Sequence, residues 1–163
     1  MTVARAETPE QFDEARALFR EYAVELGVDL SFQGFDAELA ALDQVYGPPG
    51  GAVLLASDET ARGGVTGPTT GCVAVRPAPA AGAGACEMKR LYVRPAYRGG
   101  GLGRRLAEAV VDEGRRLGYR RMVLDTLDEM ARARAVYGSL GFREVPAYYA
   151  NPLAGVHYMA VNL

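Results

Sequence analysis

Residues 98–106, RGGGLGRRL, hold four glycines and three arginines and run directly into a stretch with helical spacing of apolar residues. The first turn of a helix leaves about four backbone N–H groups without acceptors and carries roughly half a positive charge. Glycine leaves such amides open to a ligand, while Arg98, Arg104 and Arg105 add positive charge where it is mildly unfavourable. The segment therefore predicts a strand-to-helix turn that binds a phosphate, and a tight turn with solvated arginines is the alternative.

The remaining elements follow from apolar periodicity. Thr8 and Pro9 mark the start of a helix, and a glycine- and threonine-rich connection joins two strands in a hairpin pattern. In the second half strands and helices alternate, which predicts crossover units with a parallel strand pair in an α/β fold. The predicted strands are 2–7, 52–57, 71–77, 86–93, 121–126, 143–149 and 156–162, and the predicted helices are 9–26, 35–46, 102–117 and 129–140.

Length and charge set the class of protein. With 163 residues, about half of them apolar, residues 1–163 are expected to form a single domain. A formal net charge of -2 argues against nucleic acid or an anionic membrane as a partner. Neither a membrane span nor a signal peptide is recognisable, so a soluble cytoplasmic protein is expected. A single histidine, His157, and no cysteine pair at ligand spacing predict no metal site.

Two common phosphate-binding motifs do not match the glycine-rich turn. A Walker loop needs Lys-Ser or Lys-Thr after its glycines, and none follows here. A dinucleotide-binding turn needs a third glycine at a position that Arg104 or Leu106 occupies. The ligand is therefore expected to be a phosphate compound of another kind.

The order Arg98-Gly99-Gly100-Gly101-Leu102-Gly103, preceded by LYVRPAYR, matches R-x-x-G-x-G, and ARAVYGSLGF at 133–142 forms a second block. Together they resemble the acetyl-CoA-binding signature and the A-x-x-x-Y-x-x-x-G-F helix end of the GNAT acetyltransferase superfamily. The resemblance implies a mixed, mostly antiparallel sheet of about six or seven strands with a central parallel pair, flanked by about four helices. One departure is Met130, which stands where the family often has Asn.

The resemblance also implies a site for acetyl-CoA as the acyl donor. In that family a splayed gap between two parallel strands admits the thioester, here those ending near Val93 and starting near Arg121. The amides of residues 99–104 are expected to hold the pyrophosphate, and the preceding strand is expected to pair with the pantetheine arm. The implied cofactor-binding residues are Leu91, Tyr92, Val93, Arg98, Gly99, Gly100, Gly101, Leu102, Gly103 and Arg104.

Acyl transfer to an amine needs a group that takes a proton from the amine and one that gives a proton to the thiolate. Glu87 is the candidate base, because similar histone acetyltransferases have a base glutamate at the matching place, and an ion pair with Lys89 is the alternative. Tyr137 matches the motif tyrosine and is the candidate acid, with core packing as its alternative.

In similar proteins the first helices and the loop between the last strands wall the acceptor site. The candidate acceptor-binding residues are accordingly Tyr22, Phe32, Lys89 and Tyr149. Arg76, Lys89 and Arg90 are candidates for pairing with an acceptor carboxylate, or else are solvated charges. The favoured function is acetylation of a primary amine on a small, amino-acid-like or other metabolite. A protein lysine or N-terminal acetyltransferase and a non-catalytic acyl-CoA sensor remain as alternatives, and a homodimer is an expectation drawn from the resemblance alone.

Overall fold

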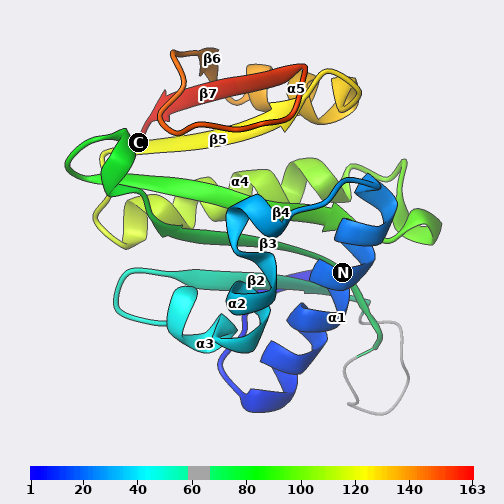
Figure 1. Ribbon diagram of the computed structural model, residues 1–163. Coiled ribbons are helices and arrows are strands. Elements are labelled where there is room, and N and C mark those ends of the chain that lie inside the picture. The colour runs from blue at the N-terminus through cyan, green and yellow to red at the C-terminus, as the bar shows by residue number, and fades with distance from the viewer. Residues whose placement is uncertain (59–66) are drawn as a thin grey trace.

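The fold is one seven-stranded sheet covered by helices on both faces (Figure 1). The structure, a computed structural model, describes residues 1–58 and 67–163, so most of the predicted glycine- and threonine-rich connection lies outside the described residues. The strand order is β1-β2-β3-β4-β5-β7-β6. The strands are β1 (Thr2–Arg5), β2 (Ala52–Ser57), β3 (Thr69–Pro77), β4 (Ala85–Val93), β5 (Arg121–Leu127), β6 (Arg143–Glu144) and β7 (Val156–Asn162). The α-helices are α1 (Pro9–Leu26), α2 (Phe35–Ala40), α3 (Leu42–Val45), α4 (Leu102–Arg116) and α5 (Ala131–Ser139), with single 3-10 turns at Ser31–Gln33 (η1), Pro79–Ala81 (η2) and Pro95–Tyr97 (η3).

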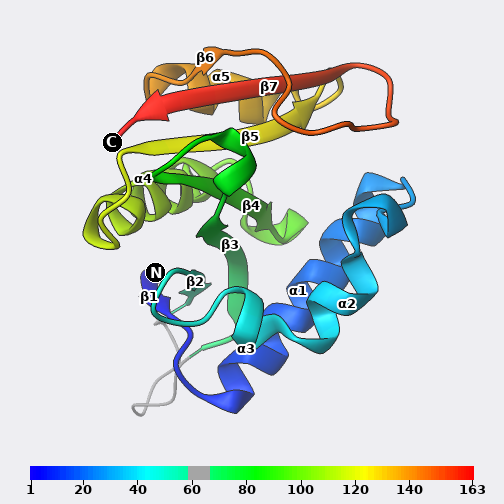
Figure 2. The ribbon, with the colours of Figure 1, turned by 60° about the vertical axis from the view of Figure 1, so that its left-hand side comes forward.

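The two faces of the sheet bury two separate cores. Side chains alternate along a strand, so Val53 of β2 packs with α1, α2 and α3, whereas its neighbour Leu54 packs with α4 and α5. On β3, Ala74 and Val75 divide in the same way. Figure 2 shows α1, α2 and α3 on one side of the sheet and α4 on the other. Near-continuous burial of β2, β3 and β4 is the signature of strands covered on both faces.

The ends of α1 form as the sequence predicts. Thr8 accepts from the amide of Gln11, and the Gln11 side chain accepts from the amide of Thr8, which completes a capping box. Pro9 occupies the first helical position, where its missing N–H costs nothing. Gly27 ends the helix in the left-handed region at φ 67°.

Strands β4 and β5 are parallel neighbours that pair along only part of their length. The paired residues are Ala85 with Arg121, Cys86 with Met122, and Glu87 with Val123. Beyond Glu87 the two strands part, while β4 continues to pair with β3 and β5 with β7. The predicted parallel pair with a gap is therefore present, and the gap opens toward the glycine-rich turn.

Two predicted elements differ in the structure. Helix 35–46 is two short helices, because Ala41 leaves the helical region at φ -118° and ψ 34°. Both pieces still bury apolar side chains against α1, among them Leu39 and Leu42. Strand 143–149 is a strand only at Arg143 and Glu144. Val145 still donates to the carbonyl of Tyr158 at 2.9 Å, but Pro146 has no N–H to continue the pairing. The chain after it turns toward the β4–β5 gap.

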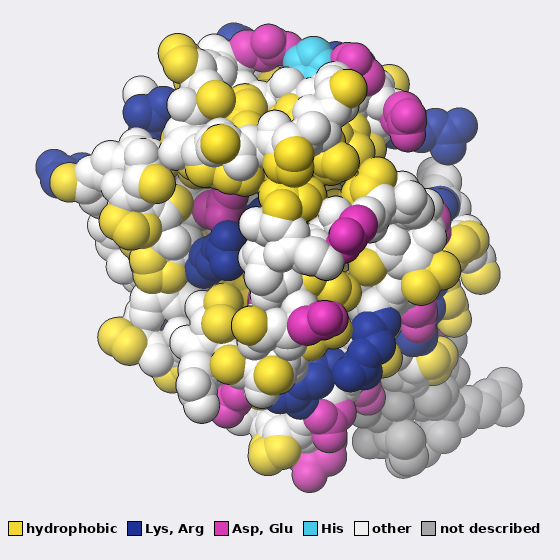
Figure 3. All heavy atoms as spheres, viewed as in Figure 1, with side chains coloured by type: hydrophobic (Ala, Val, Ile, Leu, Met, Phe, Trp, Pro, Cys, Tyr) yellow, Lys and Arg dark blue, Asp and Glu magenta, His cyan; other side chains and the backbone are white. Residues whose placement is uncertain are grey.

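Within the described residues, no helix combines the length and the hydropathy needed to cross a bilayer. In the space-filling view, positive and negative side chains are interspersed on the face that it shows (Figure 3).

Candidate active site

The glycine-rich turn presents a row of open amides at the start of α4. From Gly99 onward, Arg105 is the first residue of this turn whose amide donates to the backbone, at 3.1 Å from the carbonyl oxygen of Gly101. Among the residues that the structure describes, no hydrogen-bond acceptor faces the amides from Gly99 to Arg104. Gly99 and Gly101 have φ 90° and 78°, where residues with a Cβ are strained. Open amides at a helix start fit a pyrophosphate.

An outer cleft of about 540 Å³ extends from this turn to α5 and α1. Every predicted cofactor-binding residue lines it except Gly100, which lies in the turn between two lining glycines. The other walls come from the C-terminal half of α1 and from the start of α5. The lining residues are Tyr22, Glu25, Leu26, Leu91, Tyr92, Val93, Arg98, Gly99, Gly101, Leu102, Gly103, Arg104, Glu129, Met130, Arg132, Ala133 and Val136.

Arg98 braces the outer cleft. Its Nε donates to the carbonyl of Val93 at 2.7 Å, and its guanidinium pairs with Glu25 at 2.7 Å. The same group lies 5.6 Å from the ring centre of Tyr92. Arg104 pairs with Glu108 at 2.8 Å and is half exposed. Both arginines are therefore held by acidic or carbonyl oxygens while they keep positive charge beside the open amides.

Strand β4 bulges where it lines the gap. Its register against β3 passes from Tyr92 opposite Cys72 to Lys89 opposite Ala74, so Arg90 and Leu91 both face a single residue. Arg90 has φ 57° and is the only non-glycine in the described chain with a positive φ. Such a conformation costs on the order of 1–3 kcal/mol and persists where the surroundings hold it. A bulge of this kind also takes backbone groups out of the ladder.

A smaller inner cavity of about 40 Å³ lies at the base of the gap. It shares Tyr22, Leu26, Leu91 and Met130 with the outer cleft, so the two adjoin. Its polar lining consists of Lys89 and Arg90 from β4, Asp125 and Thr126 from β5, Gln33 and the tyrosines Tyr22 and Tyr137. Leu30, Met88, Leu124, Leu127 and Leu153 complete its walls.

Tyr137 of α5 lines this inner cavity. Burial, with smaller contributions from Tyr22 and Asp125, raises the pKa of its hydroxyl well above the usual value. Its ring packs against Phe142 at 5.9 Å between centres. The hydroxyl makes no hydrogen bond within the described part of the chain. Tyr137 is therefore both a core residue and a protonated phenol beside the junction of the two spaces.

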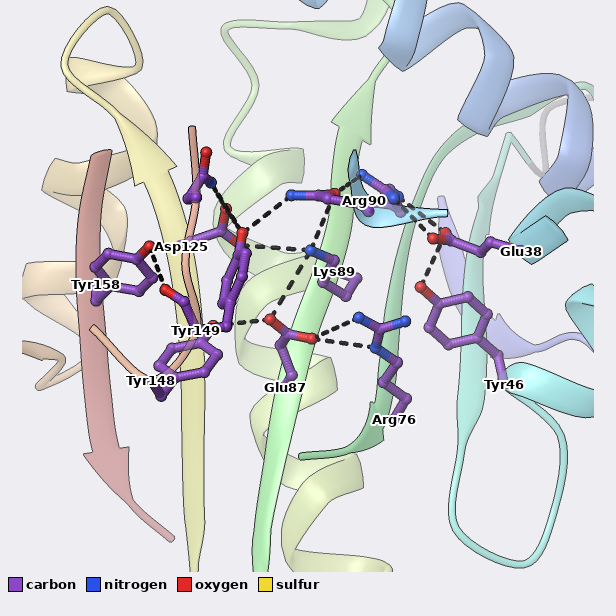
Figure 4. A network of polar contacts seen from close by, with 12 residues as sticks. Glu38, Tyr46, Arg76, Glu87, Lys89, Arg90, Asp125, Tyr148, Tyr149 and Tyr158 are labelled. Carbon is purple, nitrogen blue, oxygen red and sulfur yellow. Dashed lines mark hydrogen bonds and ion pairs between the residues drawn. The ribbon is translucent and has the colours of Figure 1, made fainter. Parts of the chain in front are cut away.

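Glu87 lies at the closed end of the gap. It is 4% exposed and lines neither the outer cleft nor the inner cavity. Arg76 donates to its Oε2 at 2.9 and 3.1 Å, and Tyr148 donates to its Oε1 at 2.7 Å. Lys89 is 3.8 Å from the same Oε1 (Figure 4). The ion pair with Lys89 that the sequence suggested is thus present but long, and Arg76 is the nearer partner.

Asp125 of β5 is the carboxylate that lines the inner cavity. Tyr149 donates to its Oδ2 at 2.8 Å and Asn151 at 3.3 Å, while Lys89 lies 3.4 Å from its Oδ1. Gln33 donates to the Tyr149 hydroxyl at 3.1 Å. Figure 4 shows Asp125, Lys89 and Tyr149 converging from β5, β4 and the loop before β7.

Of the predicted acceptor residues, Tyr22 and Lys89 line the inner cavity and Tyr149 contacts it through Asp125. Phe32 lies in η1 beside Gln33, and Gln33 rather than Phe32 lines the cavity. Sequence reasoning missed Asp125, although a lone carboxylate inside the apolar stretch RMVLDTL is an unusual residue for a buried strand. Gln33 and Asn151 carried no comparable signal, because their positions depend on tertiary contacts.

Comparisons with known proteins agree with this geometry. The model of the acetyltransferase (GNAT) family matches residues 13–142. An uncharacterized N-acetyltransferase of Schizosaccharomyces pombe is 43% identical over 163 residues, which cover 100% of this chain and 95% of the relative. An uncharacterized N-acetyltransferase of Escherichia coli is 32% identical over 132 residues, 78% of this chain and 74% of the relative.

A solved structure of a GCN5-related N-acetyltransferase from Kribbella flavida has a TM-score of 0.71 at 26% identity, and the match covers 99% of this chain and 97% of that one. The family model spans the glycine-rich turn, strands β4 and β5, and Tyr137 of α5. With that span and full-length similarity to N-acetyltransferases, the chain is an N-acetyltransferase and belongs to the acetyltransferase (GNAT) family.

Proposed function

We propose that this enzyme transfers an acetyl group from acetyl-CoA to the primary amine of a small molecule. The observation that carries the proposal is the junction of two spaces. An outer cleft with open amides adjoins an inner cavity that contains a carboxylate and a protonated phenol, and both spaces share Leu91 of the bulged strand. A donor in the outer cleft thereby reaches an acceptor in the inner one.

The open amides from Gly99 to Arg104 are suited to the CoA pyrophosphate, with Arg98 and Arg104 adding positive charge. Leu91, Tyr92 and Val93 of β4 line the path between the pyrophosphate and the gap, where an extended pantetheine arm can pair with a strand. When bound, acetyl-CoA supplies an acetyl group on a thioester. Backbone N–H groups near Tyr92 or Val93 are proposed to polarise its carbonyl.

Two side chains are proposed to move protons. Asp125 takes one proton from the acceptor ammonium, directly or through a water, because it is the carboxylate of the inner cavity. The amine nitrogen then bonds to the acetyl carbon as the carbon–sulfur bond breaks. Tyr137 gives its proton to the leaving sulfur, and the second amine proton restores the phenol through water. CoA leaves as a thiol, and Asp125 returns its proton to solvent.

Glu87 is the base that the sequence suggested, and its surroundings favour a different role. Arg76 and Tyr148 occupy its two oxygens, and Lys89 separates it from the inner cavity. We therefore assign proton removal to Asp125 and propose that Glu87 holds Lys89 and Arg76 in place.

The charge of the inner cavity favours a small molecule over a protein lysine. Two cations, Lys89 and Arg90, line it with one carboxylate, Asp125. A protein lysine would bring a positive charge with no negative group beside it, whereas a small molecule such as an amino acid brings its own carboxylate. A protein acetyltransferase that binds a lysine-containing peptide is expected to have an open, acidic groove instead.

The test is release of CoA thiol from acetyl-CoA with a panel of small amines, amino acids and lysine-containing or N-terminal peptides. The proposal predicts turnover with small amines and little with peptides. Turnover with peptides alone would make this a protein acetyltransferase. Binding of acetyl-CoA without turnover of any panel member would make it a sensor.

A further inference from the structure

Lys89 is a buried ammonium whose hydrogen bonds and ion pairs are all long. It is 5% exposed, and its Nζ lies 3.3 Å from Gln33 Oε1, 3.4 Å from Asp125 Oδ1 and 3.8 Å from Glu87 Oε1. An ammonium has three donors, and its strong bonds to carboxylates are about 2.7–2.9 Å long. All its contacts are therefore longer than a strong charge-assisted hydrogen bond.

The neighbouring cations make shorter bonds to carboxylates. Arg76 lies 2.9 Å from Glu87, and Arg90 makes bonds of 2.7 and 2.9 Å to the two oxygens of Glu38 (Figure 4). Arg90 also lines the inner cavity, but its guanidinium already donates hydrogen bonds to Glu38 and Gln33. Lys89 therefore lines the inner cavity with an ammonium that is held only by long contacts, which a bound carboxylate can replace or add to.

Lys89 and Asp125 place opposite charges side by side. Their 3.4 Å separation suits the ammonium and the carboxylate of an α-amino acid, which are attached to the same carbon atom. One α-amino acid head group can therefore contact both, with its amine at Asp125 and its carboxylate at Lys89. An amine without a neighbouring carboxylate leaves the Lys89 donors unfilled, which applies to alkylamines, protein lysines and protein N-termini alike.

The charge balance of the buried ionic cluster around Lys89 also favours an amino acid as the acceptor. The cations Arg76, Lys89 and Arg90 are matched by the carboxylates of Glu38, Glu87 and Asp125. A zwitterionic head group keeps this buried cluster neutral, whereas a cationic amine adds uncompensated charge. The cavity of about 40 Å³ suits a head group of a few atoms, and the leucines Leu26, Leu30 and Leu153 in its lining offer apolar contacts to a side chain.

Resting on the proposed function, we propose that the acceptor is an α-amino acid with an apolar side chain, whose carboxylate binds Lys89 while its amine lies at Asp125. Lys89 is then the residue that selects the acceptor. The loss of one charged hydrogen bond of this kind corresponds to about 10- to 100-fold in kcat/KM.

The experiment compares three acceptors that differ only at the carboxylate: L-leucine, L-leucinamide and 3-methylbutylamine. The methionine series, L-methionine, L-methioninamide and 3-(methylthio)propylamine, covers a second apolar side chain. We expect kcat/KM for the free acid to exceed that for the amide and the amine by about tenfold or more. In Lys89→Met this ratio should fall toward one, while Lys89→Arg should retain part of it.

Arg76→Met is the matched control, because Arg76 is a neighbouring cation that does not line the inner cavity. It should leave the acid-to-amide ratio unchanged, whatever its effect on the overall rate. Binding of L-leucine in the presence of CoA, measured by thermal shift, gives a readout that does not need turnover, and Lys89→Met should abolish it.

The outcomes separate this inference from the proposed function. Equal rates for acid, amide and amine, or an unchanged ratio in a folded Lys89→Met, overturn the amino-acid assignment and leave the acetyltransferase intact. Binding of CoA with turnover of no amine overturns both.

Discussion

Arg90 and Glu38 form a buried two-bond ion pair that joins α2 to the bulge of β4. The guanidinium donates to both carboxylate oxygens, at 2.9 and 2.7 Å, and the two residues are 5% and 4% exposed. Burial alone raises the pKa of Glu38, but hydrogen bonds and charge from Arg90, with help from Tyr46, lower it overall. Arg90 is the residue with φ 57°, so this pair holds the strained backbone beside the gap.

Glu38→Gln should therefore be strongly destabilising. It leaves the Arg90 charge buried without its partner, which typically costs about 3–5 kcal/mol. Urea unfolding measures the change. Glu21→Gln is the matched control, because Glu21 also pairs with an arginine after β4, Arg94, at 2.7 Å but with both side chains about one third exposed. Its cost should be about 1 kcal/mol or less. Equal losses in the two variants would mean that Arg90 is not held by Glu38.

Gly101→Val should weaken acetyl-CoA binding by about tenfold or more. Valine disfavours the φ of 78° at this position, and its side chain would project into space that no protein atom fills. Isothermal titration with acetyl-CoA measures the affinity. Gly138→Ala, a change inside α5 where the added Cβ also meets no atom within 4 Å, should leave the affinity unaltered. Wild-type affinity in Gly101→Val would place the cofactor elsewhere.

Tyr137→Phe should lower kcat by about 100-fold while acetyl-CoA affinity stays within about twofold. The raised pKa of Tyr137 keeps the phenol protonated, so it can supply a proton across the neutral and mildly alkaline range. The wild-type rate should accordingly show no loss from Tyr137 ionisation below about pH 10, the usual tyrosine value. An unchanged kcat in Tyr137→Phe would leave this residue with a packing role only.

Asp125→Asn and Glu87→Gln should have different effects. Asp125 lines the inner cavity, so its amide variant should lose about 100-fold or more in kcat. Glu87 contacts Arg76 and Tyr148 instead, so Glu87→Gln should mainly lower the free energy of unfolding. Steady-state kinetics measure kcat, and urea unfolding measures stability, for both variants. The larger loss of kcat in Glu87→Gln, with stability retained, would return the role of base to Glu87.

His157 should make stability depend on pH. Its ring nitrogens contact Asp128 at 2.5 Å and Glu144 at 2.8 Å, and these carboxylates raise its pKa. A raised pKa in the folded state adds stability below the unfolded value of about 6.5, and the gain is lost as the pH rises through the folded value. The difference in Tm between wild type and His157→Gln should therefore be larger at about pH 5.5 than at about pH 8.5. A difference that is the same at both pH values would contradict this.

Local patterns predicted much of this fold. The helix start at Thr8, the helix after Gly101 and the strands other than 143–149 depend on neighbouring residues, and each lies where the sequence placed it within a few positions. The parallel pair followed from element order. The break at Ala41 was not predictable, because the residues around it keep helical spacing.

The site was less accessible to sequence reasoning. The positive φ at Arg90 could not be predicted, because no glycine marks the position. The ion pair to Glu38, 52 residues away, holds this conformation. The partners of Asp125 come from β4 and the loop before β7, so only the register of the sheet brings them together. The position of Glu87 at the closed end of the gap likewise depends on where β4 and β5 part.

A crystal structure of the enzyme with CoA would show directly where the cofactor binds. We expect pyrophosphate oxygens at about 3 Å from amide nitrogens between Gly99 and Arg104, and the thiol between β4 and β5 near the Tyr137 hydroxyl. A nucleotide bound on another surface, with those amides hydrated or capped by side chains, would contradict it.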